Sequence, residues 1–255
     1  MKTFNHSSGN TLAIDTAEIY FEETGNSNKP VLLLLHGGFG SVEDFNILLP
    51  EFKNEFRIIG IDSRGQGKSS IGKTPLCYEL LQSDIESVLK HLGISELSII
   101  GISDGGVVAY RLGSYSDLKI IKLITIGSRW HSDNVVETAE ILSNVTSASW
   151  KKKFPETVAF YEKVNPDPDF NKLAPQIVNM WMNEKSYPND NVKNISANTL
   201  IIRGDNDHLT KRKFVCDLAE NIKDANLSNI AFAGHVVYTE ELKVLMLTIN
   251  RFFEQ

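Results

Sequence analysis

The stretch LSIIGISDGG, residues Leu97–Gly106, decides the fold. An apolar run leads into Gly101-Ile102-Ser103-Asp104-Gly105, and a second apolar run begins at Val107. We interpret this as a buried strand, a sharp turn carrying Ser103, and a helix, the setting in which the G-x-S-x-G pattern has meaning. Side chains beside a strained turn would clash, so the turn needs glycine on both sides. The helix would direct its first N–H groups toward the Ser103 hydroxyl.

Short apolar runs alternate with amphipathic stretches along the rest of the chain. The runs are Val31–Leu35, Ile58–Ile61, Leu97–Ile102, Ile120–Ile126 and Thr199–Ile202. Runs of this length are typical of strands buried on both faces of a parallel sheet. The spacing predicts helices over Leu76–Leu92, stopped by Gly93, and over Thr239–Phe253, begun by a capping threonine. Before them, Leu12–Asp15 and Glu18–Glu22 predict an antiparallel hairpin, with Gly25–Lys29 as the next turn. The fold class is therefore α/β, with a mostly parallel, doubly wound sheet.

One segment interrupts this alternation. Residues 129–197 contain no good buried-strand run, but they hold all three tryptophans and five of the eight prolines. We predict a helical cap over residues 129–197 and a core formed by residues 1–128 and 198–255. The cap's aromatic residues suit either a small core of its own or a lid that lines a pocket.

Composition narrows the class of protein. The 255 residues carry 26 basic and 32 acidic side chains, a net charge of −6, which gives no reason to expect nucleic acid or an anionic membrane as partner. Two cysteines, Cys77 and Cys216, fit a reducing compartment and no cysteine-based metal site. Since the first ten residues are polar and the longest unbroken apolar run is Val31–Leu35, we expect a cytoplasmic protein. We also expect it to be monomeric or homodimeric.

A serine nucleophile needs a base to take its proton and an acid to orient that base. Six histidines are candidates: His6, His36, His91, His131, His208 and His235. His235 follows a predicted strand end, and ligands of parallel sheets sit beyond the carboxyl ends of the strands, where Ser103 also lies. The strand Thr199–Ile202 leads to Asp205 and Asp207. Because aspartates also serve turns, we assign Asp205 to the turn and Asp207 to the site.

With these pieces in place, the sequence resembles the α/β-hydrolase superfamily along essentially its whole length. Five motifs occur in the family order: HGGFG at 36–40, DSRGQGKS at 62–69, GISDGG at 101–106, GDND at 204–207 and GH at 234–235. The order Ser103, Asp207, His235 is that of the family's nucleophile, acid and histidine. The predicted insertion stands where this superfamily carries its cap.

The resemblance also implies the remaining site residues. It places the oxyanion hole at the backbone N–H groups of Asp104 and Gly38, with Phe39 as the alternative to Gly38. Phe39, Asp104 and Trp130 are expected to line the substrate pocket. His36 would be a structural member of its loop. Arg64 would belong to a turn that shapes the site, with anion binding as the less favoured alternative.

The Asp104 side chain has two interpretations. An acidic residue in the first turn of a helix is favoured by the helix dipole. The Ser-Asp-Gly-Gly turn is also similar to that of valacyclovirase-like hydrolases, which implies an anion that binds a substrate amine.

The resemblance implies a serine hydrolase that cleaves a small carboxylic ester, a small-molecule acyl substrate, through an acyl-enzyme, with neither a metal nor an organic cofactor. Serine argues against haloalkane dehalogenase or epoxide hydrolase chemistry, in which this fold uses aspartate. Amino-acid ester or amide hydrolysis stays open, as do carbon–carbon bond cleavage, lactone hydrolysis and acyl transfer. A ligand-binding protein without catalysis is the alternative from another class.

Overall fold

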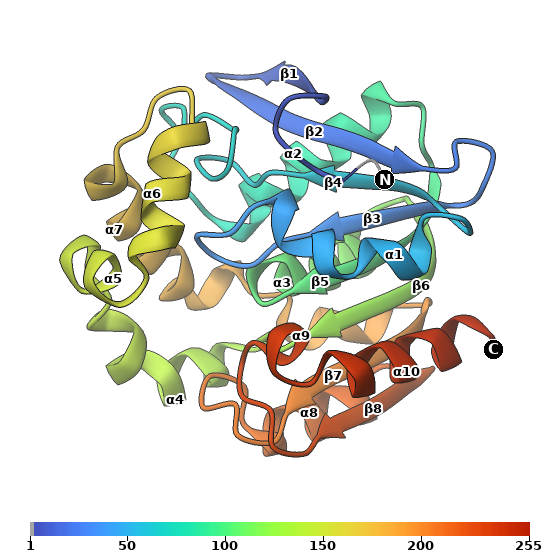
Figure 1. The fold of residues 1–255 in the computed structure, drawn as a ribbon. Coiled ribbons are helices and arrows are strands. Elements are labelled where there is room, and N and C mark those ends of the chain that lie inside the picture. Colours follow the sequence, from blue (N-terminus) through green and yellow to red (C-terminus); the bar gives the residue numbers. More distant parts are fainter. Residues whose placement is uncertain (1–2) are drawn as a thin grey trace.

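A computed structural model describes residues 3–255, so that Met1 and Lys2 of the predicted core lie outside it. Its centre is one eight-stranded sheet in the order β1-β2-β4-β3-β5-β6-β7-β8 (Figure 1). The strands are β1 (Asn10–Ile14), β2 (Ala17–Gly25), β3 (Val31–Leu35), β4 (Arg57–Ile61), β5 (Glu96–Ile102), β6 (Lys119–Ile126), β7 (Asn198–Gly204) and β8 (Ala225–Ile230). The first two strands pair antiparallel and β2 runs antiparallel to β4, whereas β4, β3, β5, β6, β7 and β8 are parallel. The α/β fold class and the hairpin are thereby confirmed.

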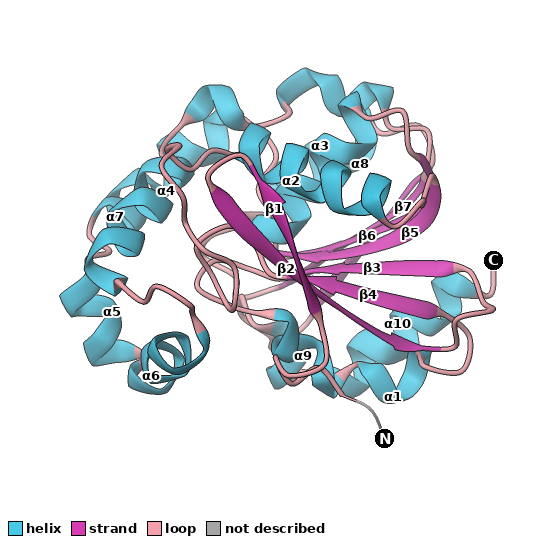
Figure 2. Ribbon diagram, turned by 90° about the horizontal axis from the view of Figure 1, so that it is seen from above, coloured by secondary structure: helices cyan, strands magenta, loops and turns pink. Residues whose placement is uncertain are grey.

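Helices cover both faces of this sheet (Figure 2). The helices α2 (Tyr78–His91), α3 (Asp104–Tyr115) and α8 (Arg212–Asn221) lie on one face, and α1 (Leu49–Phe52), α9 (Val237–Glu240) and α10 (Leu242–Phe253) on the other. Side chains of a strand point alternately to the two faces, so β3 sends Leu33 and Leu35 into one apolar cluster and Leu32 and Leu34 into the other. Burial on both sides explains why these strands are continuous apolar runs.

The predicted start of the last helix, at Thr239, is wrong. Thr239 was expected to cap a helix reaching Phe253, but it lies inside the short helix α9, where its hydroxyl donates to the Val236 carbonyl. Glu241, at φ −133°, breaks the helix, and α10 begins at Leu242.

The segment between β6 and β7 is a helical insertion. It contains α4 (Ser132–Ser143), α5 (Ser147–Lys153), α6 (Pro155–Val164), α7 (Phe170–Trp181) and the 3-10 turns η2 (Glu184–Ser186) and η3 (Asn189–Asn194). Helices α4 to α7 gather beyond one end of the sheet, the end at which β3 and β5 finish (Figures 1 and 2). We keep the name cap for residues 129–197; the domain boundaries themselves stay a prediction.

Another 3-10 turn, η1 (Val42–Ile47), follows β3. Across residues 3–255, no helix is both long and apolar enough to span a bilayer.

Candidate active site

Ser103 lies on a sharp turn between β5 and α3. Its backbone is in the left-handed region at φ 51° and ψ −114°, and its N–H donates to the Ile126 carbonyl of β6 at 2.8 Å. Such a conformation is costly for a residue with a Cβ, and it persists only where the surroundings enforce it. The side chain is half-buried at the carboxyl end of the sheet.

Glycines enforce this turn through close approach. A Cβ on Gly105 would overlap the Leu35 carbonyl of β3, and a Cβ on Gly106 would overlap the Ser128 hydroxyl. At Gly101 a Cβ would meet the backbone of Gly105 across the turn. Gly101 and Gly105, the two glycines predicted to be required, therefore let β3, β5 and α3 pack together, and Gly106 is a third glycine that close packing requires.

Ser103, His235 and Asp207 meet in one hydrogen-bonded chain. His235 Nε2 lies 3.1 Å from Ser103 Oγ, and His235 Nδ1 lies 2.9 Å from Asp207 Oδ2. Asp207 is almost fully buried, whereas 28% of the His235 side chain is exposed. Burial alone would raise the pKa of Asp207, but the hydrogen bond and charge of His235 outweigh it, so this pKa lies below its ordinary value. An ionised Asp207 can only accept, which leaves the hydrogen on Nδ1 and a free lone pair on Nε2 facing Ser103.

The two aspartates after β7 have different surroundings. Asp207 Oδ1 accepts the N–H groups of Leu209 and Thr210, which fixes its second oxygen toward His235. Asp205 instead bonds to Arg212 and Asn229 at the surface. Asp207 is thus the aspartate that the structure brings to the histidine.

Arg203 is a residue that the motif search missed. It is 2% exposed, and its guanidinium donates to the backbone carbonyls of Thr210 at 2.8 Å and of Asp205 and Asp207 at 3.2 Å. One side chain thereby ties together the loop that carries Asp207. The sequence signal was present as a charged residue inside an otherwise apolar strand.

Gly127 was missed as well. It follows β6 at φ +61°, and a Cβ there would lie 3.2 Å from His235 Nδ1 and 3.3 Å from Asp207 Oδ2. This glycine leaves room for the two side chains to meet.

The HGGFG loop packs on the other side of Ser103. A Cβ on Gly37 would be 3.2 Å from the Ser103 Cβ, and a Cβ on Gly38 would be 2.6 Å from Asp104 Oδ2. Phe39, at φ +62°, donates its N–H to Gln66 Oε1 at 2.5 Å, so this donor is already used. His36 accepts the Ser63 N–H on Nε2 and therefore donates from Nδ1 to the Gly37 carbonyl.

Aromatic side chains from the cap cover this loop. The Phe39 ring is buried, with ring centroids 4.4 Å from Trp150, 5.2 Å from Phe170 and 5.6 Å from Trp181. Trp130, by contrast, donates its indole N–H to the Phe214 carbonyl of α8 and borders a surface hollow beside that helix. The structure therefore gives the pocket prediction for Trp130 no support, and Trp181 is the tryptophan next to the turn.

The Asp104 carboxylate is buried and engaged. Oδ1 accepts the Tyr78 hydroxyl at 2.8 Å, and both oxygens lie within 2.9 Å of the Trp181 indole nitrogen. These partners come from α2 and from the cap helix α7, so Asp104 joins both to the turn that holds Ser103.

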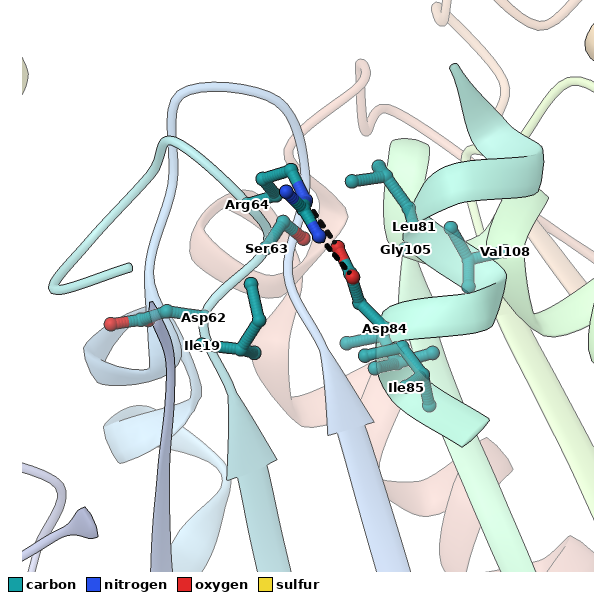
Figure 3. Close-up of a pocket in the computed structure, with 10 residues that line it drawn as sticks. Ile19, Asp62, Ser63, Arg64, Leu81, Asp84, Ile85, Gly105 and Val108 are labelled. Carbon is teal, nitrogen blue, oxygen red and sulfur yellow. Dashed lines mark hydrogen bonds and ion pairs between the residues drawn. The ribbon is translucent and has the colours of Figure 1, made fainter. Parts of the chain in front are cut away.

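Arg64 serves the scaffold. It forms a fully buried bidentate ion pair with Asp84 of α2, at 2.6 and 2.8 Å (Figure 3). Its Nη1 has no described partner, and Arg64 borders a cavity of about 10 Å³, which is the size of one water molecule. The cavity offers no room for a larger anion. Among residues 3–255, no group of three or more His, Cys, Asp or Glu side chains is arranged to hold a metal ion.

Comparison with known proteins identifies the family of this chain. Residues 30–161 match the model of the α/β-hydrolase fold. A protein of Haemophilus influenzae, provisionally named an esterase/lipase, is 25% identical over 247 residues, with 89% of this chain and 84% of the relative covered. Esterase YbfF of Escherichia coli (strain K12) is 23% identical over 244 residues, covering 89% and 94%.

Among solved structures, a bacterial membrane phospholipase A superposes with a TM-score of 0.81 at 17% identity, over 97% of this chain and 86% of that one. At this identity the likeness concerns the fold. The family model, in contrast, takes in more than half of the 255 residues, and the chain therefore belongs to the α/β-hydrolase fold family.

Proposed function

We propose that this α/β hydrolase is a serine esterase that cleaves small carboxylic esters through an acyl-enzyme. The single observation that carries the proposal is the chain of hydrogen bonds from Ser103 through His235 to the buried Asp207. Esterases among the low-identity relatives support the same reaction class. The partner is a small acyl compound, and no step requires a metal or an organic cofactor.

The first half of the reaction follows from the tautomer of His235. Its Nε2 takes the Ser103 proton while Oγ attacks the ester carbonyl carbon. The carbonyl oxygen gains negative charge, which the N–H groups of Asp104 and Gly38 stabilise at the start of α3 and in the HGGFG loop. His235 then gives its proton to the alcohol oxygen, and the alcohol leaves.

The second half repeats these steps with water. His235 deprotonates a water molecule, which attacks the acyl carbon, and the returning proton restores Ser103 as the acid departs. Asp207 keeps the imidazole oriented and stabilises its positive charge in both halves. The exposed edge of His235 gives water a route to the site.

Labelling with a fluorophosphonate tests this proposal directly. The probe should attach to Ser103, and Ser103→Ala should lose both labelling and ester hydrolysis, the latter by several orders of magnitude. Thr248→Ala is a matched control, because this half-buried residue on α10 donates its hydroxyl to the Val244 carbonyl of its own helix. An unlabelled wild-type protein that binds acyl compounds without turnover would instead favour a ligand-binding member of the fold.

A further inference from the structure

The side chain of Asp104 has no part in the mechanism above, which uses only its N–H. It is nevertheless a buried carboxylate immediately after the nucleophile, next to Gly38 of the HGGFG loop. A buried charge is costly unless it is compensated. The two hydrogen-bond partners of Asp104, Tyr78 and Trp181, are both uncharged.

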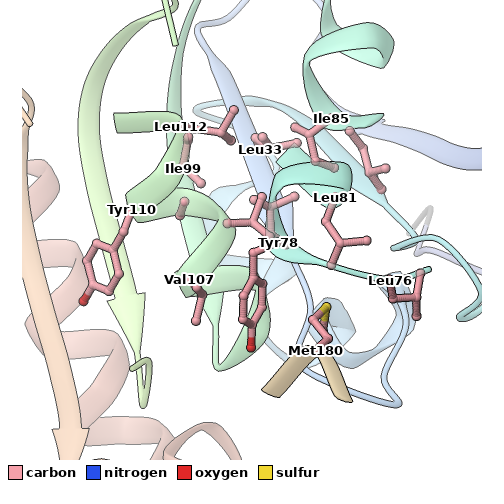
Figure 4. Close-up of a cluster of buried hydrophobic side chains, with 14 of the residues drawn as sticks. Leu33, Leu76, Tyr78, Leu81, Ile85, Ile99, Val107, Tyr110, Leu112 and Met180 are labelled. Carbon is pink, nitrogen blue, oxygen red and sulfur yellow. The ribbon is translucent and has the colours of Figure 1, made fainter. Parts of the chain in front are cut away.

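Arg129 brings a buried cation to the same cluster. This residue follows β6, is 7% exposed, and lies with its guanidinium carbon 5.3 Å from the centre of the Tyr187 ring. The Tyr187 ring contacts Tyr78 in turn, at 5.1 Å between centroids, and the Tyr78 hydroxyl reaches Asp104. Figure 4 shows the Tyr78 side chain extending between Val107 of α3 and Met180 of α7.

Arg129 carries its charge despite this burial. Burial would lower the pKa of its guanidinium, but Tyr187, Tyr78 and Asp104 act in the opposite direction, and the result is a raised pKa. Asp104 is the one carboxylate among these neighbours. A buried cation beside Tyr187 and a buried carboxylate at Tyr78 therefore lie at opposite ends of one pair of tyrosine rings.

We propose that Asp104 and Arg129 form a charge-compensated pair that makes the enzyme selective for esters with an uncharged acyl group. This proposal rests on the proposed serine esterase function. The Asp104 carboxylate borders the loop that holds the substrate carbonyl, so a charge on the substrate's α-carbon would experience the pair at short range. With Asp104 already hydrogen-bonded to Tyr78 and Trp181, and with Arg129 carrying the opposite charge nearby, an ammonium group gains little there and loses its hydration.

Three esters of matched size test the pair: ethyl hexanoate, ethyl 2-aminohexanoate and monoethyl butylmalonate, which carry hydrogen, an amine or a carboxylate on the α-carbon. The wild type should have its highest kcat/KM on ethyl hexanoate. Arg129→Gln leaves the Asp104 carboxylate without its compensating cation, which should raise the amino-to-neutral ratio of kcat/KM by about tenfold. Asp104→Asn leaves the Arg129 guanidinium without its compensating anion, which should raise the carboxylate-to-neutral ratio of kcat/KM by a similar factor.

Two further variants separate charge from packing. In the double variant Asp104→Asn/Arg129→Gln, the amino-to-neutral and carboxylate-to-neutral ratios of kcat/KM should return toward the wild-type values. Arg129→Lys keeps the cation, so both ratios should stay near the wild-type values. The proposed pair would be refuted if the wild type preferred ethyl 2-aminohexanoate to ethyl hexanoate. It would also be refuted if neither single variant changed its ratio of kcat/KM. Hydrolysis that survives in Ser103→Ala would overturn the esterase proposal instead, so the two failures are distinguishable.

Discussion

Asp205 and Asp207 stand two positions apart and differ in every contact that matters for catalysis. Asp207 is buried against His235, and Asp205 is held at the surface by Arg212 and Asn229. Asp207→Asn should lower kcat by roughly a thousandfold or more, because an amide no longer fixes the imidazole tautomer. Asp205→Asn should stay within about threefold of the wild type, as expected for a solvent-screened ion pair. Steady-state kinetics on one ester compares them, and the reverse ranking would exchange their roles.

Arg203 should act on the reaction through Asp207 alone. Arg203→Gln removes the donors to Thr210, Asp205 and Asp207, so the loop loosens and kcat/KM should fall by about a hundredfold. Arg203→Lys keeps a positive charge but has only one compact ammonium group, so its kcat/KM should lie between those of the wild type and of Arg203→Gln.

A double-mutant cycle gives the readout that a merely structural effect would not produce. In an Asp207→Asn background, Arg203→Gln should add little further loss, because the oriented carboxylate is already absent. Full additivity of the two losses would contradict a positioning role for Arg203.

At the scale of helices and strands, local signals were sufficient where the chain's own neighbours decide the structure. The turn at Ser103 and the run Val31–Leu35 were predictable because glycine spacing and apolar runs are properties of short segments. The partners of Asp104 were not, since Tyr78 and Trp181 lie 26 and 77 residues away and only tertiary packing brings them together. The start of α10 was predicted wrongly because the capping pattern at Thr239 does not reveal the backbone break at Glu241: Thr239 lies inside α9, and α10 begins without a side-chain cap.

His6 illustrates the same limit. It lies in the polar start of the chain, yet its ring is buried with Nδ1 2.7 Å from Glu43 and Nε2 2.7 Å from Asp62. Two carboxylates facing the two ring nitrogens require the doubly protonated imidazolium. This contact joins the segment before β1 to η1 and to the turn after β4.

That geometry predicts a pH-dependent stability. Burial would lower the pKa of His6, but the hydrogen bonds and charges of Asp62 and Glu43 outweigh it and raise this pKa above the ordinary 6.5. A raised pKa in the folded state gives stabilisation that is complete below the unfolded value and is lost as pH rises through the folded value. The free energy of unfolding of the wild type should therefore exceed that of His6→Gln most at about pH 6, and the difference should shrink toward pH 9.

Urea unfolding of the wild type and of His6→Gln from about pH 6 to pH 9 measures this difference in the free energy of unfolding. The titration of other groups affects both proteins alike and largely cancels in the difference. A difference that stays constant with pH would mean that His6 contributes by packing against Tyr20 and Phe160 rather than by charge.

For the whole molecule, the decisive contact joins the cap to the sheet. Asn165, before α7, donates to the carbonyls of Gly67 and Ser69 in the turn after β4, at 2.9 and 3.0 Å. Trp150 of α5 adds its ring to the cluster around Phe39. Buried cap residues such as Leu173 and Met180 belong to only one of the two apolar clusters, whereas the strands are packed between both. Cap and sheet should therefore differ in how readily they open.

Trp150→Ala should loosen the cap and leave the sheet intact. Trp150 is half-buried, so its removal should lower the free energy of unfolding by about 2 kcal/mol, less than a fully buried tryptophan would cost. Hydrogen exchange should show faster exchange in α5 and α7 with unchanged protection in β3 and β5, and kcat/KM should fall because Phe39 loses a neighbour beside the oxyanion loop. Val136→Ala, at a 65% exposed position on α4, is the control that should change neither quantity. Equal loss of protection in cap and sheet would mean that the two open as one unit, since only a separately held cap can exchange while the strands stay closed.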